Sequence, residues 1–381
     1  IWKGAYAKMM GHTPPMGWNS WNTFGVNINE QIVKEVADAM VAAGLADAGY
    51  QYVVIDDGWS LRERDENKRL VPDPEKFPSG MKALSDYVHS RGLKFGIYSC
   101  AGVKTCAGYP GSFEHEFIDA ETFAEWGVDF LKYDYCYKPR DMDGRLLYRR
   151  MAMALKNCGR EILFSACNWG IDDSHLWMRS AGAHMWRSTY DILDSWESIK
   201  KLAMQQLGKE CYSGPYSYND VDMLVVGMYN KGNVALGGCT DEEYKTHFSL
   251  WCMMNSPLMI GCDVRKMKKV TRSILTNKEL IAVNQDLEGR QAYTITGWHS
   301  KEVIHYIKPL VGGDYAICSV NFGDARGWSH LEFWDLGLPT AAGYGFELHD
   351  LWTGENLGVK TESYMTALEP HCCKVFRAKL K

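Results

Sequence analysis

The chain of 381 residues has no long hydrophobic run. Its longest apolar segments, such as Tyr52 to Ile55 and Leu258 to Ile260, have at most the length of a β-strand, whereas a membrane-spanning helix needs about 20 apolar residues. Basic clusters are also missing, and the formal charge of -5 is small for this length. The sequence therefore predicts a globular protein that neither crosses a membrane nor binds nucleic acid.

Cysteine pairs with zinc-binding spacing are missing as well. The twelve cysteines are scattered, and we expect mainly buried thiols, because several lie within apolar, strand-like segments, for example Cys252, Cys262 and Cys318. The adjacent residues Cys372 and Cys373 do not have the spacing of zinc ligands. Neither a metal nor a cofactor is therefore expected.

Residues 1–10 lack the apolar core of a signal peptide. Together with the many thiols expected to be unpaired, this favours a cytoplasmic location. Secretion stays open if a segment upstream of Ile1 is missing from the sequence. What the chain has in quantity is aromatic residues, at 13%, which stack on the apolar faces of sugars but also fill protein cores.

From about Pro14 to Val264, short apolar segments alternate with amphipathic helical patterns. This alternation is typical of βα units around a parallel sheet. Eight segments have the composition of strands, the number that closes a (β/α)8 TIM barrel. They are Met16 to Trp21, Tyr52 to Asp57, Lys94 to Ser99, Phe130 to Tyr135, Ile162 to Asn168, Ala183 to Thr189, Ser217 to Met223 and Leu258 to Val264.

The helices between these strands have recognisable ends. Asn27 is predicted to cap the first long helix, with Glu30 three residues later, and Gly44 is predicted to end it. Its predicted apolar face consists of Ile32, Val33, Val36, Met40 and Val41. A second helix has Met81, Leu84 and Val88 on one face before Gly92.

After about Gly289 the pattern changes to alternating residues separated by turn signals. Val303 to Ile307, Tyr315 to Asn321 and Cys373 to Ala378 are predicted strands, and Gly312-Gly313 is a turn signal between the first two. We therefore expect two domains, a catalytic barrel over residues 1–289 and a small antiparallel, sandwich-like β domain over residues 290–381.

Acidic residues cluster where the predicted barrel strands end, which is where (β/α)8 barrels carry their reactive groups. They are joined there by two basic residues, and the set comprises Asp56, Asp57, Lys132, Asp134, Arg187, Asp191, Asp220 and Asp222. One such acid alone could cap a helix or close a turn. Together they indicate a polyhydroxylated ligand and catalysis by carboxylates, because unpaired charges are costly to bury.

Two carboxylates suffice for glycoside hydrolysis through a covalent glycosyl-enzyme. Asp134 is the candidate nucleophile, because Lys132 lies two residues earlier on the same side of the strand and is expected to lower its pKa. Asp191 is the candidate general acid/base, for which we expect a drier and less cationic setting.

Several of these segments resemble the α-galactosidases of glycoside hydrolase family 27. The similar segments run through the predicted barrel in order and include Pro15-Met16-Gly17-Trp18-Asn19-Ser20-Trp21, Ile55-Asp56-Asp57-Gly58-Trp59, Lys104-Thr105-Cys106-Ala107-Gly108, Leu131-Lys132-Tyr133-Asp134 and Asn219-Asp220-Val221-Asp222-Met223-Leu224. The resemblance implies that Asp134 attacks and that Asp191 is the acid/base. It further implies that Asp56 and Asp57 bind the 4- and 6-hydroxyls of a terminal galactose.

The resemblance also implies the rest of the pocket. The ring of Trp21 is expected to stack against the sugar, and the side chains of Tyr98, Lys132, Arg187 and Asp222 are expected to surround the same sugar. Cys106 is expected at the pocket in a disulfide with Cys136. Asn168 stands where family galactosidases commonly have a Glu that binds the 2-hydroxyl, so the preference at that position stays open. Gly58 stands where the family usually has Cys, which fits a less oxidising compartment.

The expected activity is thus the hydrolysis of terminal α-linked galactose from an oligosaccharide or glycoconjugate, with retention of configuration. An α-N-acetylgalactosaminidase and a β-L-arabinopyranosidase use the same catalytic pair and remain alternatives. A sugar-binding protein without catalysis is the alternative from another class. The sequence leaves open the linkage, the group that departs and the formation of a homo-oligomer.

Overall fold

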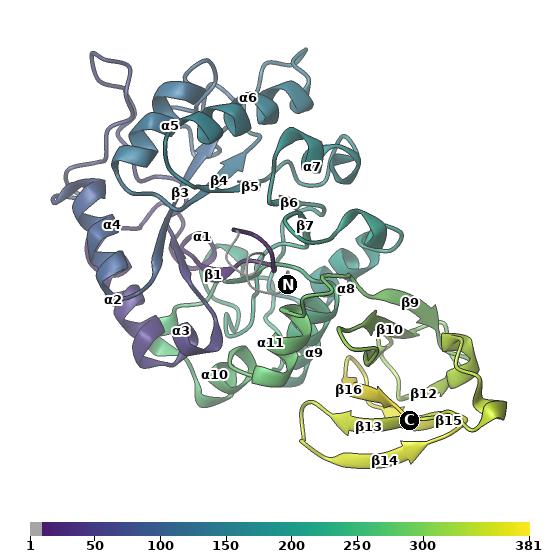
Figure 1. Cartoon of the computed structure of the whole chain (residues 1–381). Helices are drawn as coiled ribbons and strands as arrows, with labels where there is room; N and C mark the ends of the chain where they lie inside the picture. The colour runs from purple at the N-terminus through teal and green to yellow at the C-terminus, as the bar shows by residue number, and fades with distance from the viewer. Residues whose placement is uncertain (1–9) are drawn as a thin grey trace, which may run out of the picture.

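The computed structural model describes residues 10–381, so the segment on which the signal-peptide prediction depends lies outside the described residues. Eight parallel strands form a curled sheet at the centre of the larger domain (Figure 1), in the order β7-β6-β5-β4-β3-β2-β1-β8. They are β1 (Met16–Asn19), β2 (Tyr52–Val54), β3 (Lys94–Cys100), β4 (Phe130–Asp134), β5 (Leu163–Ala166), β6 (Met185–Arg187), β7 (Tyr218–Asp220) and β8 (Leu258–Ile260). Each overlaps a predicted strand.

Hydrogen bonds just beyond β7 close the sheet into a barrel. The amide of Leu224 donates to the carbonyl of Met259 at 2.8 Å, and the amide of Gly261 donates to the carbonyl of Leu224 at 3.0 Å. The predicted TIM barrel is therefore confirmed.

Helices surround the barrel (Figure 1). The longer ones are α2 (Glu30–Ala42), α4 (Gly80–Ser90), α5 (Glu116–Glu125), α6 (Gly144–Asn157), α8 (Trp196–Gln205), α9 (Asp241–Met253), α10 (Lys269–Leu275) and α11 (Lys278–Asn284). Single turns form α1 (Trp21–Phe24), α3 (Leu45–Ala48) and α7 (Met178–Ala181). Within residues 10–381, no helix combines the length and the apolarity needed to cross a membrane.

The predicted start of α2 is wrong by two residues. The side chain of Asn29, rather than Asn27, caps the helix and accepts from the amide of Ile32 at 2.9 Å. Asn27 instead closes the preceding turn, because its amide donates to the carbonyl of Phe24. Val41, predicted on the apolar face, is 43% exposed, because it is rotated by about 100° from the buried Met40.

The C-terminal domain is built from antiparallel strands, as predicted. One sheet has the order β14-β13-β16-β11-β10-β9, and a second consists of β12 and β15. The strands are β9 (Tyr293–Thr296), β10 (Val303–Pro309), β11 (Tyr315–Asn321), β12 (Gly327–Glu332), β13 (Phe346–Asp350), β14 (Asn356–Lys360), β15 (Ser363–Leu368) and β16 (Cys373–Leu380). Ile307, Ile317 and Phe376 are among the buried residues of its core.

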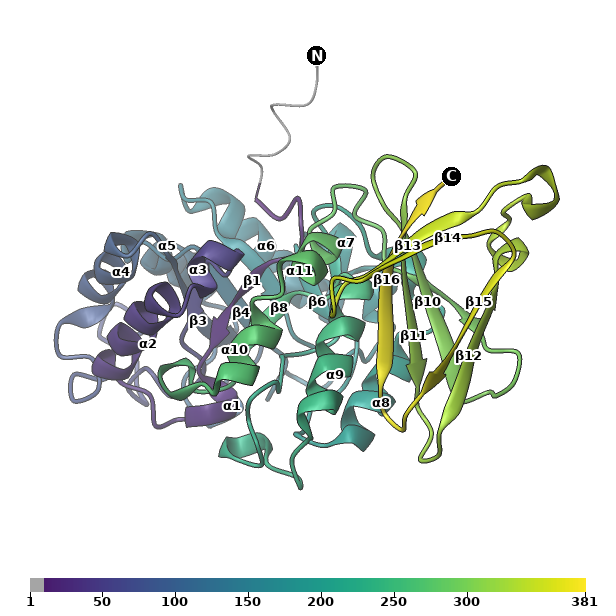
Figure 2. The same ribbon diagram turned by 90° about the horizontal axis from the view of Figure 1, so that it is seen from below.

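The two domains share an aromatic contact. The ring of Trp196 on α8 stacks on His371 at 4.5 Å between ring centroids and on Phe322 at 5.8 Å. The boundary predicted between residues 289 and 290 falls in the segment between Asn284, the end of α11, and Tyr293, the start of β9. In Figure 2, β11 and β16 lie beside α9, whereas β12 and β15 lie on the outer side of the domain.

Candidate active site

A cavity of about 320 Å³ lies at the carboxyl ends of the barrel strands. All the predicted site residues line it except Asn168 and Asp220, and Asp220 lies deeper in the barrel. The fold thus brings together side chains from β3, β4 and β6 and from the segments that follow β1, β2, β3, β6 and β7. The lining residues are Trp21, Asn22, Asp56, Asp57, Tyr98, Cys106, Lys132, Asp134, Cys136, Cys167, Trp169, Arg187, Asp191, Ile192, Leu193, Asp222, Met223, Asn233 and Val234.

Asp134 is the last residue of β4 and is buried in the wall of the cavity. Burial raises the pKa of its carboxyl to about 6, although Lys132 opposes this shift. Lys132 thus lowers the pKa of Asp134, as predicted, but burial makes the net shift of this pKa upward. The ammonium of Lys132 donates to Asp56 at 2.8 Å, and desolvation outweighs its attraction for Asp134. The charges of Asp56 and Asp191 raise the pKa of Asp134 further.

Asp191 lies at the mouth of the same cavity, in the loop after β6. Its side chain is 71% exposed and accepts from the guanidinium of Arg187 at 2.9 Å. Partial desolvation raises the pKa of Asp191, but the charge and hydrogen bond of Arg187 outweigh this and lower it below its ordinary value. The drier, less cationic setting predicted for Asp191 is therefore wrong.

Asp222 fixes both Arg187 and the loop that carries Asp191. One carboxylate oxygen of Asp222 is 3.1 Å from the Arg187 guanidinium, and the other accepts from the amide of Ile192 at 2.7 Å. Its backbone has a φ of 82°, in the left-handed region that a non-glycine residue rarely adopts. Burial raises the pKa of Asp222, and Arg187 opposes that shift. We infer a positioning role for this residue.

Asp56 and Asp57 follow β2 and are both almost completely buried. The carboxylate of Asp56 accepts from Asn19 and Lys132, each at 2.8 Å. That of Asp57 accepts from the amides of Gly58 and Ala107, also at 2.8 Å. Burial raises the pKa of Asp57, and the bond from Ala107 opposes the shift. Fixed carboxylates of this kind can accept hydrogen bonds from sugar hydroxyls without reorganising.

Gly58 allows the chain to turn sharply behind these two acids. Its φ is 88°, and a Cβ atom at this position would lie 2.8 Å from Cβ of Val26. Any larger residue would therefore need both a strained backbone and a displaced neighbour.

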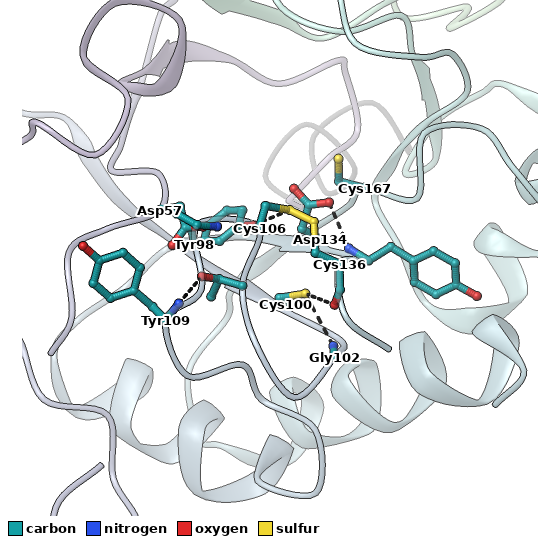
Figure 3. The surroundings of a disulfide bond; sticks show 12 residues. Asp57, Tyr98, Cys100, Gly102, Cys106, Tyr109, Asp134, Cys136 and Cys167 are labelled. Atoms are coloured by element: carbon teal, nitrogen blue, oxygen red, sulfur yellow. Dashed lines mark hydrogen bonds between the residues drawn. A yellow bond between two sulfur atoms is a disulfide. The ribbon is translucent and has the colours of Figure 1, made fainter. Parts of the chain in front are cut away.

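A disulfide joins Cys106 and Cys136 beside Asp134 (Figure 3), with their Cα atoms 5.1 Å apart. The disulfide expected from the resemblance is confirmed. It ties the loop after β3 to the loop after β4, and Tyr98 donates its hydroxyl to Sγ of Cys106 at 3.3 Å. The other ten cysteines are free, and six of these are buried, as expected.

Asn168 is a predicted site residue that the structure does not bring into the cavity. It is fully buried, and its amide donates to the carbonyl of Ile171 at 2.8 Å. Its neighbours Cys167 and Trp169 line the cavity instead. The chain turns directly after Asn168, since Trp169 has a φ of 58°, and the turn leaves Cys167 and Trp169 on the cavity side. Asn168 therefore does not line this cavity, and its expected part in binding the substrate stays a prediction.

Two other features could be mistaken for functional sites. A larger cavity of about 620 Å³ lies at the opposite end of the barrel, where Tyr52, Lys94 and Leu163 begin their strands. Its charged residues include Asp129 and Arg160, which are paired at 2.6 Å, and barrel enzymes rarely use this end. Ligand atoms of Cys106, Asp134 and Cys136 lie within 4.8 Å of one another, but the two sulfurs are joined in the disulfide.

Comparison with known proteins agrees with this geometry. The model of the family described as alpha galactosidase A matches residues 13–286, and that of the alpha galactosidase C-terminal beta sandwich domain matches residues 300–378. The chain belongs to glycoside hydrolase family 27, the α-galactosidase family. It is therefore a glycoside hydrolase.

Relatives in this family cover nearly the whole chain. The chain is 43% identical to the α-galactosidase of Cyamopsis tetragonoloba over 368 residues, which are 96% of this chain and 86% of that protein. The structure of α-galactosidase I from Mortierella vinacea matches with a TM-score of 0.91 and 34% identity, covering 97% of both chains. A family 27 β-L-arabinopyranosidase from Geobacillus stearothermophilus matches with a TM-score of 0.87 and 27% identity, covering 97% of this chain and 96% of that one.

Proposed function

We propose that the protein is a retaining, exo-acting α-galactosidase in which Asp134 is the nucleophile and Asp191 the general acid/base. The observation that carries this proposal is the placement of two carboxylates from different βα units in one sugar-sized cavity. One is buried at the end of β4, and the other is exposed at the mouth. Towards the barrel interior, the space between Phe130, Met185 and Met259 is about 30 Å³, too small for a sugar, which supports entry by a terminal sugar from the mouth.

The proposed reaction has two displacements. The carboxylate of Asp134 attacks the anomeric carbon, while the carboxyl of Asp191 gives its proton to the departing glycosidic oxygen. The glycosyl ester on Asp134 is then hydrolysed by water, from which Asp191 takes a proton. The exposed position of Asp191 suits this role, because both the departing group and the incoming water pass through the mouth of the cavity.

The proposed reaction requires the proton to lie on Asp191 when substrate is bound. In the free enzyme Asp134 holds a proton more tightly than Asp191 does. A bound sugar replaces water around Asp191 and so raises its pKa, since a less hydrated carboxylate is less stable. The same proton then lies on the acid/base rather than on the nucleophile.

Galactose is favoured over the alternative sugars by the walls of the cavity. The resemblance assigns Asp56 and Asp57 to the 4- and 6-hydroxyls, and a pentopyranose such as arabinose lacks the 6-hydroxyl. Trp169 lines the cavity with its large indole, which leaves less room for an additional acetamido group. Both carboxylates are retained, which favours an enzyme over a sugar-binding protein without catalysis.

The test compares hydrolysis of nitrophenyl α-galactoside, α-N-acetylgalactosaminide and β-L-arabinopyranoside by the purified protein. We expect the highest kcat/KM with the α-galactoside, and proton NMR should detect α-galactose as the first product. A preference for either other glycoside would overturn the substrate assignment alone. If β-galactose appeared first, the retaining mechanism would be wrong, and if no glycoside were cleaved, the proposed function would fail.

A further inference from the structure

We propose that the C-terminal domain carries a second carbohydrate-binding site, on the outer face of the β12–β15 sheet and the loop after β9. This face would hold a neutral polysaccharide whose galactose side groups the barrel removes. The inference extends the proposed function to polymeric substrates. We call it the tryptophan face and define it by Trp298, His299, Trp328, His330, Glu332 and Trp334.

The tryptophan face exposes three indole rings. Trp298 is 57% exposed, Trp328 is 48% exposed and Trp334 is 54% exposed. The rings of Trp298 and Trp334 lie 5.9 Å apart, with an angle of 64° between their planes. Burying a tryptophan side chain stabilises a fold. A cluster of tryptophans that stays exposed therefore indicates a binding surface.

The sheet places the remaining ring and the polar groups on the same side. Alternate residues of a strand share one face, so Trp328, His330 and Glu332 point outward while Ser329 and Leu331 are buried beneath them. The residues opposite Trp328, His330 and Glu332 on β15 are Ala367, Met365 and Ser363. Figure 2 shows these two strands on the side of the domain away from the barrel.

Hydrogen bonds fix the polar groups between the rings. The indole N–H of Trp298 donates to Asp335 at 3.0 Å. Nε2 of His330 is 2.8 Å from Glu332 and so donates to it, and Nδ1 of the same ring is 2.9 Å from Nε2 of His299. Groups that are already held in place lose little side-chain entropy when they bind a ligand.

The chemistry of this face indicates a sugar chain rather than a protein or a polyanion. Its ionisable groups are already partnered, since Arg326 pairs with Glu369 at 3.2 Å and Glu332 accepts from His330 at 2.8 Å. A surface whose charges are paired favours a neutral ligand. The rings are separated by hydrogen-bonding side chains instead of forming one continuous apolar patch. A polysaccharide offers the matching alternation of apolar C–H faces and hydroxyl groups.

A second site would act by raising the local concentration of substrate. A chain held on the tryptophan face meets the catalytic cavity of the same molecule more often than a free chain does. This benefit applies to a polymer only, because nitrophenyl α-galactoside is too small to engage both sites.

The test uses the full chain, soluble galactomannan as the probe and the double variant Trp298→Ala/Trp334→Ala. Both side chains are more than half exposed, so we expect the variant to fold with an unchanged thermal midpoint. Val359→Ala is the matched control, because Val359 is 51% exposed on β14, at the opposite edge of the six-stranded sheet from β9. Binding is measured by retardation in native gels containing galactomannan, in an Asp134→Asn background that prevents hydrolysis.

We expect the double variant to lose most of its retardation and the control to keep it. In the active enzyme, kcat/KM on galactomannan should fall about tenfold, the equivalent of one strong aromatic contact, while kcat/KM on nitrophenyl α-galactoside stays unchanged. Equal retardation of the double variant and the control would overturn the proposal. A change in oligomeric state without a change in retardation would also overturn it and assign the face to a second copy of the chain. Failure to cleave the nitrophenyl substrate would refute the proposed function alone, because the gel measures binding independently.

Discussion

The protonation of the catalytic pair predicts an acidic pH optimum. Burial raises the pKa of Asp134 to about 6, and Arg187 holds that of Asp191 below its ordinary value. Between these two values the free enzyme holds one proton on the pair. Double displacement needs one ionised carboxylate and one carboxylic acid, which is also one proton in total. Because the two carboxyl groups interact, the apparent pKa values measured from the pH dependence of kcat/KM belong to the pair rather than to either residue.

The alkaline limb of kcat/KM should therefore have an apparent pKa of about 6. Above this pKa, the fraction of enzyme that carries the essential proton falls about tenfold with each pH unit. At pH 8, kcat/KM should therefore be about 100-fold below its maximum. The sign follows from the raised pKa, because the proton is present below this value and lost above it.

The assay is kcat/KM for nitrophenyl α-galactoside from pH 4 to pH 9, with circular dichroism at each pH to exclude unfolding. A constant kcat/KM between pH 6 and pH 8, with the fold intact, would refute this account of the pair.

Three further predictions test single parts of the site. Asp191→Asn should lower kcat on a disaccharide about 10²- to 10⁴-fold but much less on a nitrophenyl galactoside, whose leaving group needs little protonation; equal losses would contradict its role as the acid. Replacing Cys106 and Cys136 with Ser should lower the free energy of unfolding by about 3 to 4 kcal/mol and raise KM, as measured in urea and by kinetics. A chelator should leave the rate unchanged, and inhibition reversed by added metal would contradict a reaction that runs on the carboxylates alone.

Much of the barrel could be predicted because parallel strands are buried on both faces and appear in the sequence as short apolar runs between helices that end in glycine. The catalytic acids could be found because the fold fixes where strands end. Asp134 and Asp191 lie far apart in the sequence yet line one cavity. The cap at Asn29 was missed because Asn27 and Asn29 are equally suitable by type, and the turn that Asn27 closes is a tertiary detail.

The contacts within the site were less predictable. Alternation shows that Lys132 and Asp134 face the same side, but it does not show that the ammonium would pair with Asp56. The same alternation applied to β5 could have identified Cys167 instead of Asn168, since Ser165 and Cys167 both face the barrel interior. The exposure of Asp191 depends on the loop after β6, and loop conformations leave little trace in sequence. The cellular location stays a prediction.

The central claim is that Asp134 forms a covalent bond with the sugar, and trapping that intermediate tests it most directly. A fluorinated α-galactosyl fluoride that forms the glycosyl-enzyme rapidly but is released slowly should inactivate the protein. Mass spectrometry of the digest should then show one added fluorogalactosyl group on the peptide that contains Asp134, and galactose should protect against labelling. Labelling of a different carboxylate, or hydrolysis of the reagent without any adduct, would contradict the account.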